Sequence, residues 1–171
     1  MTRELLTLAL VACTSKSDAP LRSESKPAPK AEQTHKIDKL QMTVPDGWTA
    51  TYDADGDKWL FESPKLADGR TANARIERAP ESAVASPDAY LAQLRRVWDA
   101  GTTAELEKRE SVKGGFAMTL VVKPAADPAH PKRETYVIRE LGSVWYQCLS
   151  EWIPDDATRD QVMALCKSLK L

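Results

Sequence analysis

The chain has 171 residues, of which 42% are hydrophobic, 29% charged and 6% aromatic, and its formal net charge at pH 7 is -1. This length suits one globular domain of ordinary composition with a short appendage. The near-zero charge offers no basic field to phosphate, which argues against a nucleic-acid partner, and no apolar stretch reaches the roughly 18 residues that a membrane-spanning helix needs.

A short apolar run near the N-terminus ends in Leu10, Val11, Ala12 and Cys13. This order resembles the lipobox of bacterial lipoprotein signal peptides: Leu, a small or branched residue, Ala or Gly, and then an obligatory Cys. The resemblance implies cleavage after residue 12 and acylation of the Cys13 thiol. Such an anchor holds a protein on the membrane surface without spanning the bilayer. The alternative is an N-terminal core helix with a buried Cys13.

The segment that follows Cys13 has the composition of a disordered tether. It contains three prolines, five basic and three acidic residues, no aromatic residue, and Leu21 as its one large aliphatic residue. It cannot bury enough apolar surface to offset the entropy of ordering. We therefore divide the chain into a signal peptide at 1–12, a lipidated cysteine and tether at 13–36, and a globular domain at 37–171.

Alternating apolar and polar residues predict strands in the domain. The first alternation places Leu40, Met42 and Val44 on one face of a half-buried strand. A hairpin follows, because two strand-like runs flank a connection rich in Asp and Gly. The hairpin and the later strands are predicted at 48–52, 58–63, 70–78, 116–122, 133–141 and 144–152.

Two helices have clear boundary signals. Ser86 as the N-cap and Pro87 at the first helical position predict the start of one helix. This helix carries an apolar stripe that includes Val97, and Gly101 is its predicted stop signal. The second helix extends from about residue 155 to 168, with an apolar face. The order of strands, a helix, more strands and a terminal helix predicts an α+β fold, with a mainly antiparallel sheet and two or more packed helices.

The cysteines predict a disulfide. With Cys13 assigned to lipid, Cys148 and Cys166 form an even remainder in an exported chain. Cys148 lies in the last predicted strand and Cys166 on the apolar face of the terminal helix, which must pack back onto the sheet. A bridge here would stabilise the fold by roughly 3 kcal/mol. The alternative is two buried free thiols.

The domain opens with Val44, Pro45, Asp46, Gly47 and Trp48. This motif resembles the hydrophobic-Pro-x-Gly-Trp opening of PsbP-like domains, a group that includes the photosystem II PsbP proteins and bacterial DcrB-type lipoproteins. The later order of hairpin, helix, strands and C-terminal helix also fits. The resemblance covers about residues 37–171 and implies an α/β/α sandwich whose members mostly act as non-catalytic binding or assembly modules.

No sequence motif predicts a cofactor or a phosphate site, since the chain has no Walker loop, no nucleophile elbow and no dinucleotide fingerprint. Three aspartates at 53, 55 and 57 begin like a calcium loop. An EF-hand, however, would need Gly at Lys58 and Glu at Pro64, so a hairpin turn is the better interpretation. We predict no cofactor, no metal ligand and no catalytic residue from these patterns.

The remaining titratable residues also give no catalytic pattern. His35 and His130 complete neither a zinc spacing nor a nucleophile-base pair. Glu105, Glu107 and Glu110 are interleaved with basic residues, which indicates the solvated side of a strand or turn. Carboxylates brought together only by folding would still support an enzyme.

Two tryptophans provide the candidate ligand or partner surface. Trp145 points away from the face of Tyr146 and Cys148, so helices on both sides of the sheet would place it in the core. If that face is open, Trp145 and Trp48 are candidates to line a groove for a partner or a small ligand.

The sequence therefore predicts a bacterial envelope lipoprotein, anchored to a membrane through Cys13, with a non-catalytic domain that binds an envelope protein or a small ligand. The choice between the inner and the outer membrane stays open. One alternative is an envelope enzyme with a carboxylate-based site that forms only in the fold. Another is a cytosolic protein with no processing.

Overall fold

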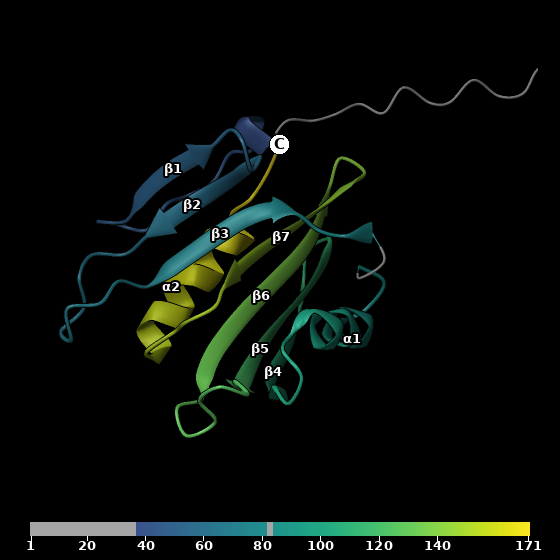
Figure 1. The fold of residues 1–171 in the computed structure, drawn as a ribbon. Helices are drawn as coiled ribbons and strands as arrows, with labels where there is room; N and C mark the ends of the chain where they lie inside the picture. The colour runs from purple at the N-terminus through teal and green to yellow at the C-terminus, as the bar shows by residue number, and fades with distance from the viewer. Residues whose placement is uncertain (1–36, 82–83) are drawn as a thin grey trace, which may run out of the picture. The chain divides into compact units, whose positions relative to one another are not determined.

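The computed structural model describes residues 37–81 and 84–171. They form a seven-stranded antiparallel sheet with two α-helices (Figure 1), so the predicted α+β class is confirmed. The predicted signal peptide, Cys13 and the tether lie outside the described residues. None of the helices in the described part of the chain is long and apolar enough to cross a membrane.

The first three strands form one side of the sheet, and the last four strands pair inward from the opposite edge. The strands are β1 (Thr49–Asp53), β2 (Lys58–Glu62), β3 (Asn73–Arg78), β4 (Thr103–Val112), β5 (Gly115–Lys123), β6 (Lys132–Leu141) and β7 (Val144–Ser150). The helical segments are η1 (Ile37–Lys39), α1 (Pro87–Val97) and α2 (Asp156–Lys167). The strand order is β1-β2-β3-β7-β6-β5-β4. The segment with α1 thus carries the chain from β3 to the far edge, and β7 closes the sheet against β3.

Two-residue turns join β4 to β5 and β6 to β7. Gly142 and Ser143 both have positive φ, at 57° and 71°, which is the two-residue turn whose twist matches that of the flanking strands. At Gly115 an added Cβ would lie 1.9 Å from the carbonyl oxygen of Ile138. Only glycine therefore allows β5 and β6 to pair at this point.

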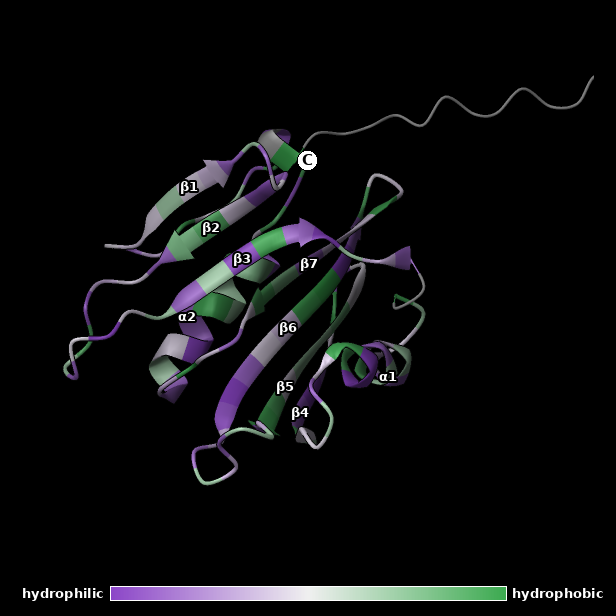
Figure 2. Ribbon diagram, viewed as in Figure 1, coloured by the Kyte–Doolittle hydropathy of each residue, from purple (hydrophilic) through white to green (hydrophobic). Residues whose placement is uncertain are grey.

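The two faces of the sheet carry separate apolar clusters. Figure 2 shows hydrophobic and hydrophilic residues alternating along β3. Alternate residues of each strand point to opposite faces. Ala117, Val137 and Cys148 pack with α2 on one face, which we call the α2 face. Met118 and Ile138 belong to the cluster with α1 on the other, which we call the α1 face. One helix therefore covers part of each face.

Contacts at both ends fix α2. Asp155 is its N-cap and accepts a hydrogen bond from the backbone N–H of Thr158 at 2.7 Å. At the other end the guanidinium of Arg139, only 6% exposed, donates to the carbonyl oxygens of Lys167 and Leu169 at 2.6 and 3.0 Å. A cation at the negative end of the helix dipole is a stabilising arrangement.

The predicted strand over residues 40–44 is wrong. Leu40 is buried, and Met42 and Val44 are partly buried, so the alternation correctly predicts the side that faces inward. The segment, however, makes only an isolated bridge, between Gln41 and Lys170. It packs beside the end of α2 and does not join the sheet, and an alternating pattern alone cannot separate these two outcomes.

The boundaries of α1 differ in part from the prediction. Ser86 is the N-cap and its Oγ accepts from the N–H of Ala89 at 3.1 Å, as expected. The helix ends at Val97, before Gly101, and Val97 is 68% exposed. Val97 therefore does not belong to the buried stripe, whereas Leu94 and Trp98 pack against the cluster of the α1 face as predicted.

Candidate functional site

Trp48 and Trp145 do not share a surface. Trp48 is 8% exposed, belongs to the cluster of the α2 face, and donates from its indole N–H to Oε1 of Gln161 at 3.1 Å. Trp145 is partly buried and packs with the cluster of the α1 face. The predicted two-tryptophan groove is thus not formed, because the sheet separates the two side chains.

The predicted disulfide between Cys148 and Cys166 is present, with a Cα–Cα distance of 5.5 Å. It joins β7 to α2 inside the cluster of the α2 face. Both cysteines are fully buried. They hold the fold together and offer no reactive thiol, and Cys13 lies outside the described residues.

The aspartates at 53–57 form the turn of the β1–β2 hairpin. Asp53 accepts from the N–H of Gly56 at 3.1 Å, and Tyr52 donates its hydroxyl to Asp57 at 2.7 Å. The hydrogen bond from Gly56 lowers the pKa of Asp53. His130 is exposed and contacts Asp127 at 2.8 Å, whereas His35 lies outside the described residues. Among the described residues no three side chains of the metal-binding types gather as a metal site.

A row of polar side chains crosses the part of the α1 face that α1 leaves uncovered. We call Tyr90, Gln147, Glu77, Arg75 and Glu151 the polar row. The Tyr90 hydroxyl donates to Gln147 at 2.6 Å, and the Gln147 amide donates to Glu77 at 2.5 Å. Arg75 donates to the same oxygen of Glu77 at 3.2 Å and pairs with Glu151 at 3.0 Å. The row thus links α1, β7 and β3 and ends just beyond β7.

A buried carboxylate lies next to this row on β6. Glu134 is 7% exposed and accepts a hydrogen bond from the Tyr136 hydroxyl. Burial raises the pKa of Glu134, and the nearby negative charge of Glu151 acts in the same direction. Burial also raises the pKa of both Tyr90 and Tyr136, whose ring centroids are 5.5 Å apart. Both phenols therefore stay protonated donors near neutral pH.

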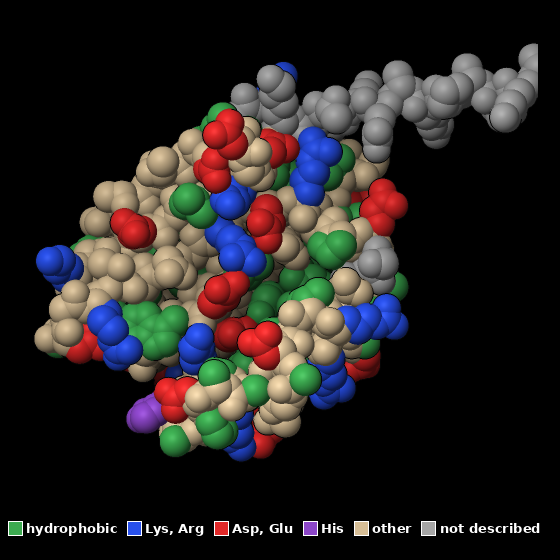
Figure 3. Space-filling view, in the orientation of Figure 1, with side chains coloured by type: hydrophobic (Ala, Val, Ile, Leu, Met, Phe, Trp, Pro, Cys, Tyr) green, Lys and Arg blue, Asp and Glu red, His purple; other side chains and the backbone are tan. Residues whose placement is uncertain are grey.

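A groove of about 250 Å³ lies between these residues and the β2 side of the sheet. Its lining mixes apolar and charged side chains: Leu60, Phe61, Arg75, Leu149, Glu151 and Glu62. Figure 3 shows the same face hollowed between β3 and α1, with acidic and apolar side chains in the hollow. We take the groove, the polar row and the Glu134–Tyr136 pair together as the candidate site.

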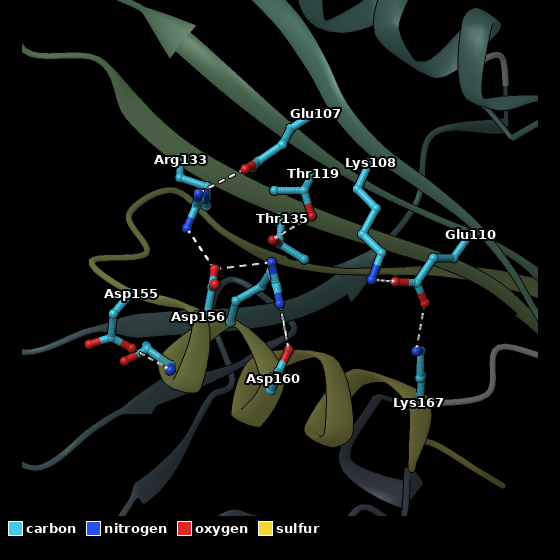
Figure 4. A network of polar contacts seen from close by, with 12 residues as sticks. Glu107, Lys108, Glu110, Thr119, Arg133, Thr135, Asp155, Asp156, Asp160 and Lys167 are labelled. Atoms are coloured by element: carbon cyan, nitrogen blue, oxygen red, sulfur yellow. Dashed lines mark hydrogen bonds and ion pairs between the residues drawn. The ribbon is translucent and has the colours of Figure 1, made fainter.

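A second polar network lies on the α2 face, between β4 and α2 (Figure 4). Glu110 contacts Lys108 at 2.5 Å and Lys167 at 2.9 Å, and hydrogen bonds from these two lysines lower its pKa to about 2. Arg133 bridges Glu107 and Asp156 at 2.7 and 3.0 Å. These contacts attach the edge strand and β6 to α2. Because these charges are matched in ion pairs, we assign this network to structure.

None of the residues of the candidate site was predicted as functional, although the sequence contains a signal. In the strand predicted over 70–78, Arg75 and Glu77 occupy the alternate positions to the buried Ala74 and Ile76. In β6 the buried Glu134 shares its face with the buried Tyr136 and Ile138. Charges at such positions in inner strands indicate a sheet face that is only partly covered.

The described residues thus form an α+β domain with a sheet covered by one helix on each side and a polar groove on the α1 face. No family model and no curated protein matches the chain. One solved structure that is similar to it is a protein of Bacteroides thetaiotaomicron VPI-5482, with 17% sequence identity and a TM-score of 0.37. The match covers 78% of this chain and 45% of that chain, so this chain spans less than half of that protein.

Proposed function

We propose that this protein is a bacterial envelope lipoprotein, anchored through Cys13, whose domain binds a ligand or partner without catalysis. The lipobox and the tether composition support the anchor. The Cys148–Cys166 disulfide supports export, because disulfides persist in oxidising compartments and are rare in the cytosol. We also propose a PsbP-like α/β/α sandwich, which is supported by the helix on each face of the sheet and by the order of the elements.

One observation carries the binding role: charged side chains occupy inner strands on an uncovered sheet face. Arg75 and Glu77 on β3 are partly exposed and Glu134 on β6 is buried, and all three lie on inner strands where a covered face would carry apolar residues. The cost of desolvating such groups is tolerated where they recognise something. The adjoining groove offers both an apolar strip and oriented polar atoms, which is the usual make-up of a binding site.

A specific observation also favours the enzyme alternative. Glu134 is a buried carboxylate with a raised pKa beside a second carboxylate, Glu151, and such carboxyl groups serve as general acids. The groove, however, is small, and the carboxylate of Glu134 already accepts a hydrogen bond from the Tyr136 hydroxyl. A panel of chromogenic ester, glycoside and phosphate substrates tests this candidate. Turnover that Glu134→Gln abolishes would establish an enzyme.

The anchor is tested by Cys13→Ser in the full chain, with Thr14→Ser as the matched control. We expect the wild type and the control to incorporate a palmitate analogue and to sediment with membranes. Cys13→Ser should lose the label and appear in the soluble envelope fraction. Unchanged labelling and sedimentation in Cys13→Ser would refute the lipoprotein proposal.

The binding role is tested by photo-crosslinking in intact envelopes. A photoreactive amino acid replaces Leu60, which lines the groove and is 38% exposed, or Val97, which is 68% exposed on α1 and lies outside the groove. We expect a discrete adduct from position 60 and none from position 97. Equal adducts from both positions, or none from position 60, would contradict a binding role for the groove.

A further inference from the structure

The two edges of the sheet differ in how well they are protected. An edge strand presents backbone N–H and C=O groups to any further strand, and proteins blunt such edges with charges and bulges. At one edge β4 has a shift of register between Leu106 and Lys108, and five of its ten residues are charged. At the other edge β1 pairs with β2 in unbroken register, and its one charged residue is Asp53 at its end (Figure 1). Addition of a further strand is therefore favoured at β1.

The hydrogen-bond pattern shows which residues of β1 point outward. In an antiparallel ladder every second residue directs both its N–H and its C=O toward the same neighbouring strand. The N–H of Ser63 donates to the carbonyl oxygen of Ala72, its opposite residue, at 2.8 Å. Ser63 and every second residue before it thus face β3, and Leu60 faces β1. Because Leu60 is opposite Thr51, Thr51 directs its backbone groups to β2, and the residues on either side of it direct theirs to the outer edge.

The side chains of β1 leave this edge accessible. Thr49, Ala50 and Thr51 are exposed, and Tyr52 and Asp53 are half-buried. The Tyr52 side chain is held in place, because its hydroxyl donates to the hairpin turn at 2.7 Å and its ring lies 5.3 Å from an aromatic ring of β2. Pairing with β2 places Ala50 and Tyr52 on the α2 face, and alternation places the other three residues on the α1 face.

We infer that β1 pairs with β1 of a second copy of this chain, antiparallel and about a two-fold axis between the two Thr51 residues. In this register Ala50 of each copy lies opposite Tyr52 of the other. Each of these two pairs exchanges two backbone hydrogen bonds, because both residues direct their backbone groups outward. The two sheets then form one continuous sheet with α2 of both copies on the same face, which is an isologous contact.

The side chains of β1 are self-complementary in this register, which favours a second copy as the partner. The small Ala50 lies opposite the large ring of Tyr52 on the α2 face. On the α1 face, Thr51 meets Thr51 at the axis, a favourable cross-strand pair, and the hydroxyl of Thr49 is placed to donate to the carboxylate of Asp53. The two Asp53 residues lie about 14 Å apart, at roughly 3.4 Å per residue along the strands. No like charges of β1 are therefore opposed.

The dimer also arranges the two candidate grooves. Leu60 lines the groove on the α1 face and is opposite Thr51 on β1. The paired β1 strands therefore lie beside the groove of each copy, and both grooves open on the same side of the joined sheet. The inference goes beyond the proposed function and does not depend on what the groove binds.

The test is disulfide trapping in the full-length protein with Cys13→Ser, in which an introduced cysteine is the one reduced thiol because Cys148 and Cys166 are joined. Thr51→Cys places two thiols across the axis, where opposite Cα atoms lie about 4.5 Å apart, within reach of a disulfide. Thr49→Cys is the matched control, since Thr49 is exposed on the same face of β1 and its two copies lie about 14 Å apart. We expect Thr51→Cys to form covalent dimers at least about tenfold faster than Thr49→Cys under a mild oxidant.

Sedimentation equilibrium of lysine variants in the same Cys13→Ser protein measures the association without a covalent bond. Pairing of one short strand is a small and weak interface, so concentrations up to about 1 mM are needed. Thr51→Lys opposes two ammonium groups at the axis and should weaken association about fivefold, whereas Thr49→Lys faces Asp53 twice and should tighten it about fivefold. Near-UV circular dichroism checks that both variants keep the native fold.

The outcomes decide the inference separately from the proposed function. Preferential trapping of Thr51→Cys, with opposite effects of the two lysine variants, supports the β1 dimer. Equal trapping of the two cysteine variants, effects of the same sign from both lysines, or a protein that stays monomeric at about 1 mM overturns it. The photo-crosslinking at Leu60 still decides whether the groove binds a ligand or partner.

Discussion

The two faces of the sheet differ in how completely they are covered, and the difference separates stability from recognition. On the α2 face, the helix, η1 and residues 40–48 cover the strands, and a disulfide and the Arg139 contacts fix the helix. On the α1 face, α1 covers β5 and part of β6, and the surface over β3 and β7 carries the polar row. We expect the first face to supply most of the free energy of unfolding and the second to supply the binding groove.

The largest expected effect comes from truncating one leucine on each face. Leu165 of α2 is fully buried, so Leu165→Ala should lower the free energy of unfolding by about 2–5 kcal/mol. Leu91 of α1 is only partly buried, so Leu91→Ala should cost about 1 kcal/mol, since less apolar area is lost. Urea denaturation measures both. Equal losses would show that α1 packs as firmly as α2 and would remove the contrast.

The disulfide on the α2 face gives the next effect. Its two cysteines are separated by 18 residues, and reduction should lower the free energy of unfolding by about 3 kcal/mol, because the unfolded chain regains the entropy of an open loop. Urea denaturation with and without a thiol reductant measures the difference. The double variant Cys148→Ala with Cys166→Ala is the control and should not respond to the reductant. A wild type equally insensitive would mean that the bridge contributes nothing.

Much of the fold could be predicted from the sequence, because local signals determine it. Ser86 and Pro87 predict the start of α1, and the flanking alternation with Gly142 predicts the β6–β7 hairpin. The strand predicted at 40–44 failed because pairing depends on which segments meet in space, which a pattern in one segment does not contain.

The candidate site could not be predicted for a related reason. Arg75, Glu77, Glu134 and Gln147 come from three strands that are brought together only by the return of β7 to β3. The aromatic composition suggested Trp48 and Trp145 instead. Alternation assigns a residue to a face only relative to its neighbours. The faces of Trp48 and Trp145 therefore also depend on the pairing of β7 and on the position of residues 40–48.

The α1 face should show an unusual dependence of stability on pH. Because burial raises the pKa of Glu134, the folded protein favours its protonated form. The contribution of Glu134 is fully present below the pKa of an unfolded glutamate, about 4.3, and is lost as the pH rises through the raised value. Glu134→Gln cannot ionise, so the variant should be more stable than the wild type at neutral pH, by less than the effect of the disulfide.

Urea denaturation of both proteins from pH 4 to pH 8 tests this, because other groups cancel in the difference. The exposed Glu140 on the same strand gives the control, Glu140→Gln. A Glu134→Gln variant that is less stable than the wild type at pH 7 would mean that the ionised carboxylate is well compensated in the fold. Burial would then not dominate the electrostatics of Glu134.

The smallest effect belongs to Glu110, the ion-paired carboxylate on the α2 face, and its sign is opposite. Lys108 and Lys167 hold its pKa at about 2, so its contribution is present above about pH 4.5 and is lost as the pH falls toward 2. Because these side chains are partly exposed to water, the contribution should be only about 0.2–1 kcal/mol and should shrink with added salt. Glu110→Gln should therefore lower the free energy of unfolding slightly at pH 7 and not at pH 2, as urea denaturation can measure. A loss well above 1 kcal/mol would mean that β4 depends on this contact with α2 for its place in the sheet, and the α2 face would then rely on charge as well as on apolar packing.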